Sequence, residues 1–333
     1  MATIKDIARL ASVSHTTVSR ALNGSLLISD ETKNRIIDLS KQLGYTPNHF
    51  AKSLVMKKSF RLALFFTSLN YGVTSDYFFN SVKFILSKVK HKYTLMIRGI
   101  DDYKDTYNTI NKNNVDGVIV VSQCGEDDGF IQYLKKEGIP QVIINRFVDD
   151  DEIDCVYSNE REIVRVSIES MIKKGLNRVA FVKGAENFYS TEERYQGYLD
   201  ALKNCNVKVD DSLLYSGDFG MSSGNAAMKS ILHKLGDNLP DSIFFSSDEM
   251  ALGAINLIKS NNISIPGDMS IMGFDNSELS AYIVPGLTTI DRPVSKILNE
   301  GLSCLLARID DKNMPHVKKK IDSKIIERGT YIF

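Results

Sequence analysis

The chain has 333 residues, more than one globular domain usually contains, so two or three domains are expected. Hydrophobic residues make up 43% and charged residues 25%, which excludes a disordered or fibrous protein. The net charge is zero, but residues 1–59 hold nine Lys and Arg against four Asp and Glu, so a basic N-terminal segment precedes an acidic remainder. This asymmetry indicates a polyanion-binding module joined to a module that does not bind polyanions.

No segment predicts a secretory signal or a membrane span. The longest apolar runs, such as residues 62–66, are far shorter than the roughly 20 residues that a bilayer requires, and we therefore expect a cytoplasmic protein. The four cysteines are widely spaced and form no CxxC pair. We therefore expect buried thiols, with no metal site, disulfide framework or cofactor.

Residues 1–46 predict three short helices. The first follows Thr3, whose side chain can cap it, and apolar residues at helical spacing within residues 4–11 form one buried face. The second begins after Ser14, and the third lies between the cap Ser29 and the stop signal Gly44. Three short helices with a polar second helix are typical of a helix-turn-helix unit.

The second predicted helix carries a polar face suited to DNA. Its outward side chains are small and polar or carry hydrogen-bond donors, as base edges and phosphates in a major groove require. This face comprises His15, Thr16, Ser19, Arg20 and Asn23. The alternative is a structural three-helix domain, because any such domain has a polar outer face.

Residues 47–59 predict a hinge helix between the head and the remainder of the chain. The apolar residues 54–56 have no local core to join, and a helix this short is not stable alone in water. An apolar wedge flanked by lysines is typical of an element that kinks the minor groove and folds only with DNA and a second copy. A plain interdomain linker is the alternative.

Together these segments resemble the DNA-binding head of the lactose- and galactose-repressor family. The resemblance is carried by residues 3–8, 13–23, 44–48 and 51–54, in the family's order and spacing. It implies that major-groove bases are read by His15, Thr16 and Arg20, that phosphates are contacted by Ser14, Thr17 and Ser19, and that Leu54 enters the minor groove. The implied DNA-binding set is completed by Thr3, Asn23, Asn48, Ala51 and Lys52.

Residues 60–333 predict an α/β body of two lobes with parallel sheets. Short apolar runs alternate with segments of helical length such as 160–174, a pattern typical of βαβ units. The runs are residues 62–66, 118–121, 142–144, 179–182, 213–216, 243–245 and 270–274. Ligands of such sheets bind beyond the carboxyl ends of the strands, so the polar residues there are candidate ligand contacts.

Those candidates are carboxylates, amides and a guanidinium near an aromatic ring. Such groups bind sugar hydroxyls through bidentate hydrogen bonds, while the ring stacks on the apolar face of the sugar. We expect Asp275 and Arg194 to contact the ligand, with Arg194 at a predicted helix start. For Asp248, ligand contact and capping of the helix that follows it are equal alternatives.

The body also resembles the periplasmic-binding-protein-like core of the same repressors. The resemblance rests on residues 145–146, 194–197, 247–251, 273–275 and 285–290. The effector-binding set that it implies is Phe78, Asn145, Arg194, Phe219, Ser247, Asp248, Asp275 and Arg292. Asn145 stands where the family usually has Asp, and Ser247 where it usually has Asn, so the effector's identity stays open.

The same resemblance implies the division of the body. One lobe would comprise residues 60–158 and 291–320, and the other residues 159–290 and 321–333, with a last strand near 325–331. The sequence ends at Phe333 without the leucine-heptad tail of tetrameric relatives, which favours a homodimer.

The sequence therefore predicts a repressor whose affinity for pseudo-palindromic operator DNA is controlled by a small sugar, such as a galactoside. A purine or a phosphocarrier protein is the alternative signal. Residues 220–224 fit GxSxG and residues 218–220 fit DFG, but the first lacks a strand leading into its serine and an oxyanion loop, and the second lacks the other kinase motifs. No enzymatic activity is expected.

Overall fold

The computed structural model describes residues 2–22, 25, 27–45, 58–72, 74–90, 92–236 and 238–331. Its contacts divide the chain into two compact units, Met1–Lys58 and Ser59–Phe333. Several residues predicted to bind DNA lie outside the described ranges, namely Asn23, Asn48, Ala51, Lys52 and Leu54, together with the rest of the predicted hinge from 47 to 57. Within the described ranges, no helix is both long and apolar enough to cross a membrane.

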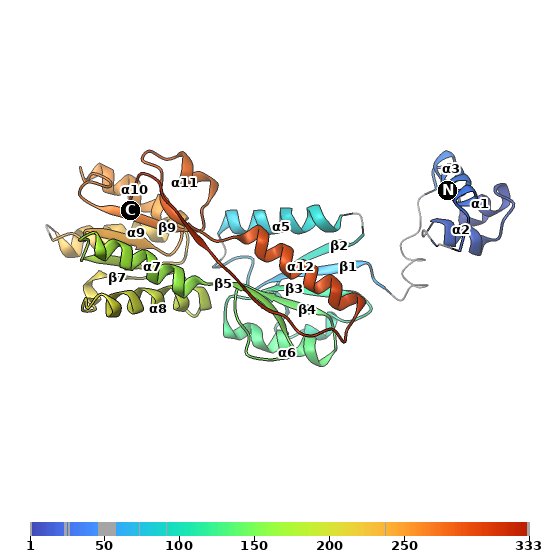
Figure 1. Ribbon diagram of the computed structural model, residues 1–333, viewed down its shortest axis with the longest axis horizontal. Helices are drawn as coiled ribbons and strands as arrows, with labels where there is room; N and C mark the ends of the chain where they lie inside the picture. The colour runs from blue at the N-terminus through green and yellow to red at the C-terminus, as the bar shows by residue number, and fades with distance from the viewer. Residues whose placement is uncertain are drawn as a thin grey trace. The chain divides into compact units, whose positions relative to one another are not determined.

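The head, which is the first unit, contains the three predicted helices (Figure 1). They are α1 (Ile4–Leu10), α2 (His15–Leu22) and α3 (Asp30–Gln42). The predicted caps are confirmed: the Thr3 hydroxyl accepts from the Asp6 N–H in a capping box, and the Ser14 Oγ accepts from the Thr17 N–H at 3.0 Å. At the other end of the head, Gly44 adopts a φ of +59°, the left-handed conformation that ends α3.

The core of the head is small and built from all three helices. Ile7 of α1, Val18 of α2 and Ile36 of α3 are completely buried against one another. The Arg35 guanidinium also donates to the Ala11 carbonyl at 2.8 Å, tying α3 to the turn after α1. This packing turns the polar side of α2 away from the core.

The N-lobe of the body is built on a six-stranded parallel sheet. Its strands are β1 (Arg61–Phe66), β2 (Thr94–Gly99), β3 (Gly117–Val121), β4 (Gln141–Ile144), β5 (Asp154–Ser158) and β11 (Lys318–Ile321), in the order β11-β5-β4-β3-β1-β2. One face is covered by α5 (Ser75–Val89) and α12 (Val294–Asp310), and the other by α6 (Asp128–Lys136), as Figure 1 shows. Both faces are therefore buried, which explains the continuous apolar runs of these strands.

The C-lobe repeats this plan with a second six-stranded sheet. Its strands are β6 (Val179–Val182), β7 (Leu214–Tyr215), β8 (Ser242–Phe245), β9 (Ser270–Phe274), β10 (Thr288–Asp291) and β12 (Lys324–Ile326), in the order β12-β10-β9-β8-β6-β7. Only β12 is antiparallel to its neighbour. The helices are α7 (Glu160–Lys173), α8 (Tyr189–Asn204), α9 (Met221–Leu235), α10 (Asp248–Ser260) and the short α11 (Glu278–Tyr282).

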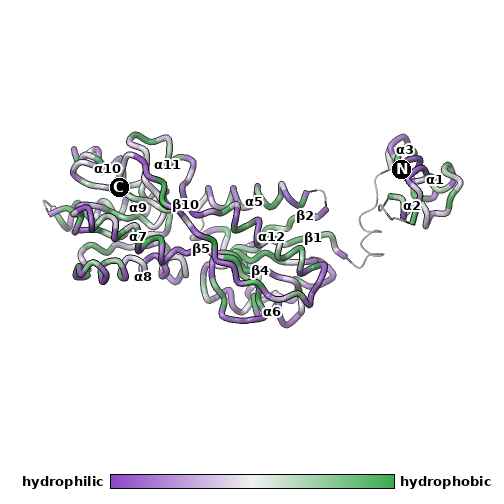
Figure 2. Tube along the Cα trace, viewed as in Figure 1, coloured by the Kyte–Doolittle hydropathy of each residue, from purple (hydrophilic) through white to green (hydrophobic). Residues whose placement is uncertain are grey.

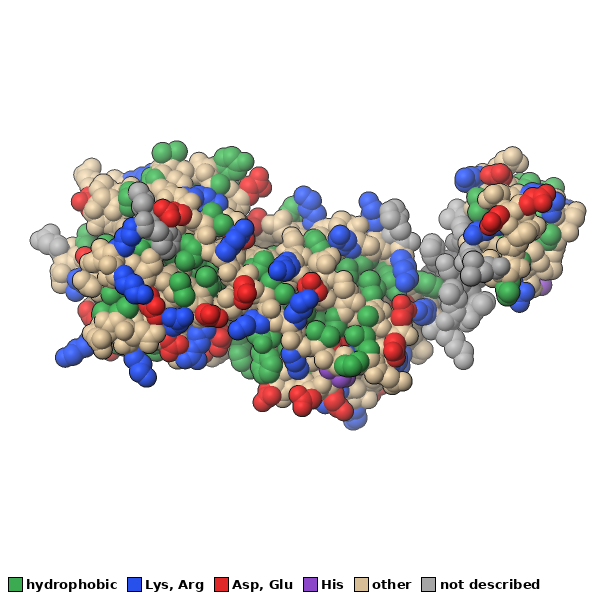
Figure 3. Space-filling model, viewed as in Figure 1, with side chains coloured by type: hydrophobic (Ala, Val, Ile, Leu, Met, Phe, Trp, Pro, Cys, Tyr) green, Lys and Arg blue, Asp and Glu red, His purple; other side chains and the backbone are tan. Residues whose placement is uncertain are grey.

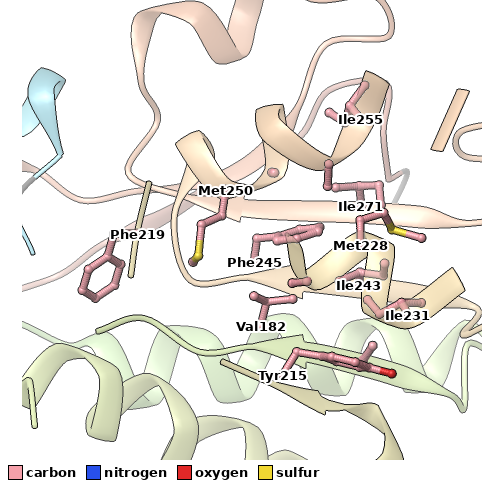
Figure 4. Close-up of a cluster of buried hydrophobic side chains, with 14 of the residues drawn as sticks. Val182, Tyr215, Phe219, Met228, Ile231, Ile243, Phe245, Met250, Ile255 and Ile271 are labelled. Atoms are coloured by element: carbon pink, nitrogen blue, oxygen red, sulfur yellow. The ribbon is translucent and has the colours of Figure 1, made fainter. Parts of the chain in front are cut away.

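In the C-lobe, α7 and α8 pack on one face of the sheet and α9 and α10 on the other. Figure 2 shows the hydrophobic segments concentrated inside each lobe. Figure 4 shows the cluster beneath α9 and α10, where Val182, Ile243 and Phe245 lie together, while Phe219 stands at its edge. The apolar runs predicted as strands are confirmed, although the last strand is Lys324–Ile326 and overlaps the predicted range 325–331 only at its start.

The chain passes between the lobes three times: after β5, after β10 and after β11. Hydrogen bonds also join the lobes. The Tyr189 N–H donates to the Gln123 carbonyl at 2.8 Å, and the Ser75 N–H donates to the Glu249 carboxylate at 3.1 Å. The residues that follow the strands thus meet between two sheets that are separately packed.

Candidate functional site

The polar face predicted on α2 is exposed. His15, Thr16 and Arg20 lie at the surface, and Thr17 and Ser19 are half-buried beside them. Val18 and Ala21 occupy the opposite, buried side of the same helix. This eight-residue helix therefore presents hydrogen-bonding side chains outward from a packed core, as a helix that lies in a DNA groove requires.

Of the predicted phosphate-contacting residues, Ser14 and Thr17 lie at the start of this helix, and Ser19 lies in its second turn. The Ser14 and Thr17 hydroxyls are 2.9 Å apart, and the Thr3 hydroxyl donates to the Asp6 carboxylate at 2.7 Å. Hydroxyls already used as caps hold the backbone N–H groups of the helix starts in place. They can still contribute an exposed oxygen to a ligand.

Between the lobes lies a cavity of about 20 Å³. It is lined by Gly72, Thr74, Tyr77 and Gln123 from the N-lobe and by Ser190, Arg194, Phe219, Asp275 and Arg292 from the C-lobe and the crossover after β10. A cavity of this size holds about one water molecule. We call it the inner cavity.

A second cavity of about 420 Å³ adjoins it and shares Ser190 with the inner cavity. Its walls are the segments after β4 and β5 in the N-lobe and the first turns of α7 and α8, including Asn145, Tyr157, Glu160 and Tyr189. This outer cavity falls within the range of small-molecule sites, roughly 300 to 1,000 Å³.

Two arginines and two carboxylates form one buried network at the inner cavity. Arg194 Nε donates to Glu160 Oε2 at 2.8 Å, and Arg292 Nη2 donates to Asp275 Oδ1 at 2.8 Å. Arg292 Nη1 lies 3.9 Å from Glu160 Oε1, which joins the two pairs. Arg194 is 2% exposed and Glu160 is 4% exposed, so these charges have little water to stabilise them and depend on one another.

Aromatic rings complete the site. The Arg194 guanidinium lies 3.6 Å from the Phe274 ring centroid and 5.6 Å from that of Phe219. The Arg292 guanidinium lies 4.2 Å from the ring centroid of Tyr77. Such cation–π contacts hold the two guanidinium groups flat against ring faces.

The backbone at three site residues adopts positive φ values. They are +82° at Asn145, +75° at Phe219 and +118° at Asp275, in segments that follow strands or precede α9. The Phe219 ring packs directly against Gly184, where a Cβ atom would lie only 2.1 Å from the ring. Unusual backbone conformations at three points of one cleft are typical of a functional site.

Burial controls the ionisation of the site. It raises the pKa of Asp275, an effect that the neighbouring Arg292 and Arg194 oppose. It also raises the pKa of Tyr77, whose hydroxyl donates to Asn145 Oδ1 at 2.8 Å. The Asn145 side-chain nitrogen has no hydrogen-bond partner among the described residues.

The structure brings most of the predicted effector residues together. Arg194, Phe219, Asp275 and Arg292 line the inner cavity, and Asn145 lines the outer one. Arg194 lies in the second turn of α8 rather than at the helix start that the sequence predicted, because α8 begins at Tyr189.

Three predicted effector residues lie elsewhere. Phe78 packs against Phe66 in the N-lobe core, with ring centroids 5.1 Å apart, and its neighbour Tyr77 faces the cavity instead. Ser247 is the N-cap of α10 and donates to the Phe219 carbonyl at 2.6 Å. It therefore supports a site residue from behind without lining either cavity.

Asp248 is buried and links three segments of the C-lobe. Its carboxylate accepts from the Ser277 N–H at 2.7 Å and from the Thr289 hydroxyl at 2.5 Å, linking α10 to the segment after β9 and to β10. Burial and the charge of Asp275 raise its pKa to about 7. Neither role that the sequence left open for Asp248 is observed, because Ser247 caps α10 and Asp248 lines neither cavity.

The sequence prediction missed Tyr77, Gln123, Glu160 and Ser190. Gln123 and Glu160 each lie two residues after a strand, β3 and β5, so the rule that identified Asn145 applied to them as well. The strand before Glu160 contains the polar residues Asp154 and Ser158, so it was not recognised as an apolar run in the sequence.

The chain matches two family models. Residues 3–48 match bacterial regulatory proteins of the lacI family, and residues 168–331 match a periplasmic binding protein-like domain. The fold also superposes on the crystal structure of the Lac repressor dimer bound to operator and the anti-inducer ONPF. The TM-score is 0.83 at 21% identity, over 99% of this chain and 98% of that one.

Two curated relatives extend over almost the full length. The probable HTH-type transcriptional repressor ExuR of Bacillus subtilis is 40% identical over 332 residues, which is 100% of this chain and 97% of that protein. The HTH-type transcriptional repressor PurR of Aliivibrio salmonicida is 30% identical over 94% of each chain. Both relatives are transcriptional repressors rather than enzymes. By its sequence, its helix-turn-helix head and its two-lobed body, this chain belongs to the LacI family of bacterial transcriptional repressors.

Proposed function

We propose that the operator affinity of this repressor is controlled by a small sugar bound between the two lobes. The observation that carries the proposal is the buried network of Glu160, Arg194, Asp275 and Arg292 beside the Phe219 ring. Carboxylates and guanidinium groups bind neighbouring hydroxyls in pairs, and a ring packs on the apolar face of a sugar.

The arrangement of the rings favours a sugar over a purine. A flat base is held by stacking between ring faces, but Arg194 covers a face of Phe274 and Arg292 covers a face of Tyr77. Phe219 is then the ring of the inner cavity that lies farther from a guanidinium. One ring beside many polar groups suits a polyhydroxylated ligand.

Binding at the inner cavity requires the lobes to rearrange. A cavity of about 20 Å³ is too small for a sugar, and its walls come from both lobes. The ligand would therefore bind one lobe arrangement better than another and shift the equilibrium between them. The coupling is reciprocal, so operator DNA should weaken effector binding by the same factor by which the effector weakens operator binding.

On the DNA side, the proposal retains the contacts implied by the sequence. His15, Thr16 and Arg20 read bases in the major groove, and Ser14, Thr17 and Ser19 hold phosphates. The hinge, with Leu54 at the minor groove, folds on the operator and melts when the lobes move.

We also propose that the protein acts as a homodimer through an apolar face of the body. Met221, Leu279 and Tyr282 are 44%, 58% and 75% exposed and line a groove of about 720 Å³ with Ser75 and Asp76 at the start of α5. Figure 3 shows exposed hydrophobic side chains along the upper edge of the C-lobe, near α11 in Figure 1. The apolar side chains of this groove come from the C-lobe and part of its polar wall from the N-lobe, so a second copy bound there would sense the relative position of the lobes.

The proposal is tested with the purified full-length chain. A preferred palindromic duplex is first selected from a randomised library, and its binding is followed by fluorescence anisotropy while sugars and purine bases are added. A sugar that binds should also stabilise the protein, by roughly 2.7 kcal/mol at about 100 times its Kd. Release of the duplex by a sugar supports the proposal, whereas release or tightening by purines alone overturns it.

A dimer variant completes the test. Tyr282→Glu places a charge in the apolar face and should convert the dimer into a monomer in sedimentation, with at least tenfold weaker binding to the palindrome. The control is Val209→Glu, which places the same charge at an apolar residue that is 50% exposed and lies outside the groove. Equal sedimentation of both variants and the parent protein would contradict the proposed interface.

A further inference from the structure

Two buried nitrogen donors at the cleft have no hydrogen-bond partner in the described part of the chain. They are Nδ2 of Asn145 and Nε of Arg292. Arg292 as a whole is only 7% exposed, so water does not replace the missing partner. Buried donors are almost always paired, and two unpaired ones at one site indicate that they serve a ligand.

Both donors adjoin the same side chain, Tyr77. The Tyr77 hydroxyl donates to Asn145 Oδ1 at 2.8 Å, which leaves Nδ2 as the free end of the amide. The guanidinium of Arg292 lies 4.2 Å from the Tyr77 ring centroid. Tyr77 and Arg292 line the inner cavity and Asn145 lines the outer one, so Tyr77 connects one donor from each cavity.

Other hydrogen bonds of the network join its guanidinium groups to acceptors within the cleft. Arg292 Nη2 is bonded to Asp275, and the Arg194 guanidinium is bonded to Glu160 and to the Ser246 carbonyl. Among the described residues that line the two cavities, no buried side-chain acceptor is left without a partner. The unmet demand of the cleft is therefore for acceptor atoms, next to a positively charged guanidinium.

We infer that the effector carries a carboxylate, as a monosaccharide acid does, and that its two oxygens accept hydrogen bonds from Asn145 Nδ2 and Arg292 Nε. The hydroxylated body of the ligand occupies the outer cavity of about 420 Å³. Two donors match the two oxygens of a carboxylate, whereas a phosphate presents three oxygens and more charge. This inference rests on the proposed function, since it names the chemical class of the effector for the same cleft.

The experiment compares matched ligands on the full-length protein by thermal shift and calorimetry. The panel contains aldohexoses, the uronic and aldonic acids of the same configuration, and the corresponding 6-phosphates. A carboxylate that replaces a neutral group gains charge-assisted hydrogen bonds, so at least one acid should bind at least tenfold more tightly than its neutral parent. The same acid should release the operator duplex at lower concentration.

Two variants locate the interaction. Asn145→Asp changes only the amide into a carboxylate, so repulsion should weaken binding of the acid at least tenfold and reduce the preference for the acid over its neutral parent sugar. Arg292→Lys keeps a positive charge beside Asp275 but removes Nε, and should also weaken the acid at least tenfold.

Matched controls exist elsewhere in the C-lobe. Asn262 also has a positive φ, +60°, and is exposed, so Asn262→Asp repeats the chemical change away from the cleft. Arg178 also has a buried Nε without a partner in the described chain, which makes Arg178→Lys the control for the second variant. Both should bind the acid as the parent protein does.

The outcomes separate this inference from the proposed function. Operator release by neutral sugars, with the acids no better, overturns the carboxylate and keeps the sugar-controlled repressor. Tighter binding of the 6-phosphates than of the acids overturns it in favour of a phosphate ligand. Absence of any response to sugars of any charge overturns both.

Discussion

The DNA-facing helix of the head and the cleft of the body use polar side chains in opposite ways. On α2, His15, Thr16 and Arg20 are exposed, and each is free to be hydrated without help from the others. In the cleft, Arg194 and Glu160 are almost fully buried and depend on each other for compensation of charge. Substitutions on α2 should therefore act separately and on DNA binding alone, whereas substitutions in the cleft should couple stability with effector binding.

The largest effect is expected at the buried ion pair. Arg194→Met leaves Glu160 without its closest cation, and breaking a buried pair in this way costs about 3–5 kcal/mol of stability. Urea unfolding followed by circular dichroism measures the loss. The double variant Glu160→Gln with Arg194→Met should recover much of the lost stability. A loss of less than about 1 kcal/mol in the single variant Arg194→Met would show that Glu160 does not depend on Arg194 for compensation of its charge.

The second prediction tests the separateness of the head. Ile7 is completely buried in its small core, and Ile7→Ala should cost about 2–5 kcal/mol, enough to unfold a domain of this size. Operator binding should be lost, while the thermal transition of the body and its effector binding persist. Leu27, which is 78% exposed, provides the control as Leu27→Ala; a body transition that falls together with that of the head would contradict independent units.

The third prediction concerns recognition by α2. Arg20→Ala should weaken binding to the selected duplex by about 1–3 kcal/mol with less effect on random duplex, if Arg20 reads a base edge. Effector affinity and thermal stability should not change, because the side chain is exposed. Anisotropy at two salt concentrations checks this, with Lys173→Ala on the body as control. An equal loss on both duplexes would assign Arg20 to phosphate contact.

The smallest effect is a pH dependence. The folded-state pKa of Asp248, about 7, lies above the ordinary value of 3.8, so the folded protein binds a proton more readily than the unfolded chain. This contribution to stability is fully present below pH 3.8 and is lost as the pH rises through 7. The free energy of unfolding should therefore fall between pH 5.5 and 7.5, by roughly 2 kcal/mol at most from this group.

Asp248→Asn removes the titration while keeping an oxygen acceptor for Ser277 or Thr289. Its stability should depend less on pH over the same range. Asp268→Asn is the comparison, because hydrogen bonds from Ser264 lower the pKa of that carboxylate, so it does not titrate in this window. Equal slopes for Asp248→Asn and the parent protein would remove Asp248 as the source of the dependence.

Local patterns in the sequence predicted the head in detail. Thr3, Ser14 and Ser29 cap the three helices as expected, and the buried Ile7, Val18 and Ile36 follow from helical periodicity. They do so because a cap or an apolar stripe is set by residues three or four positions apart. The apolar runs of the body predicted strands because a strand that is buried on both faces carries apolar residues in succession.

The cleft was only partly predictable. Asn145 and Asp275, which the strand-end rule selected, do line the cavities. The family resemblance selected Phe78, whereas its neighbour Tyr77 on α5 lines the inner cavity. Neither the rule nor the resemblance could show that Ser247 and Asp248 face inward to cap and brace α10. The direction of these side chains depends on how the helix packs on its sheet.

By itself, then, the amino-acid sequence determined the helices of the head, their caps, those strands of the body that form apolar runs, and the family to which the chain belongs. Only the tertiary structure decided which charges pair, because Glu160, Arg194, Asp275 and Arg292 come from a crossover, a helix and two strand ends far apart in the chain. Buried charges cannot remain unpaired, and their partners are selected by distance in space. That selection left the donors of Asn145 and Arg292 unpaired at the cleft.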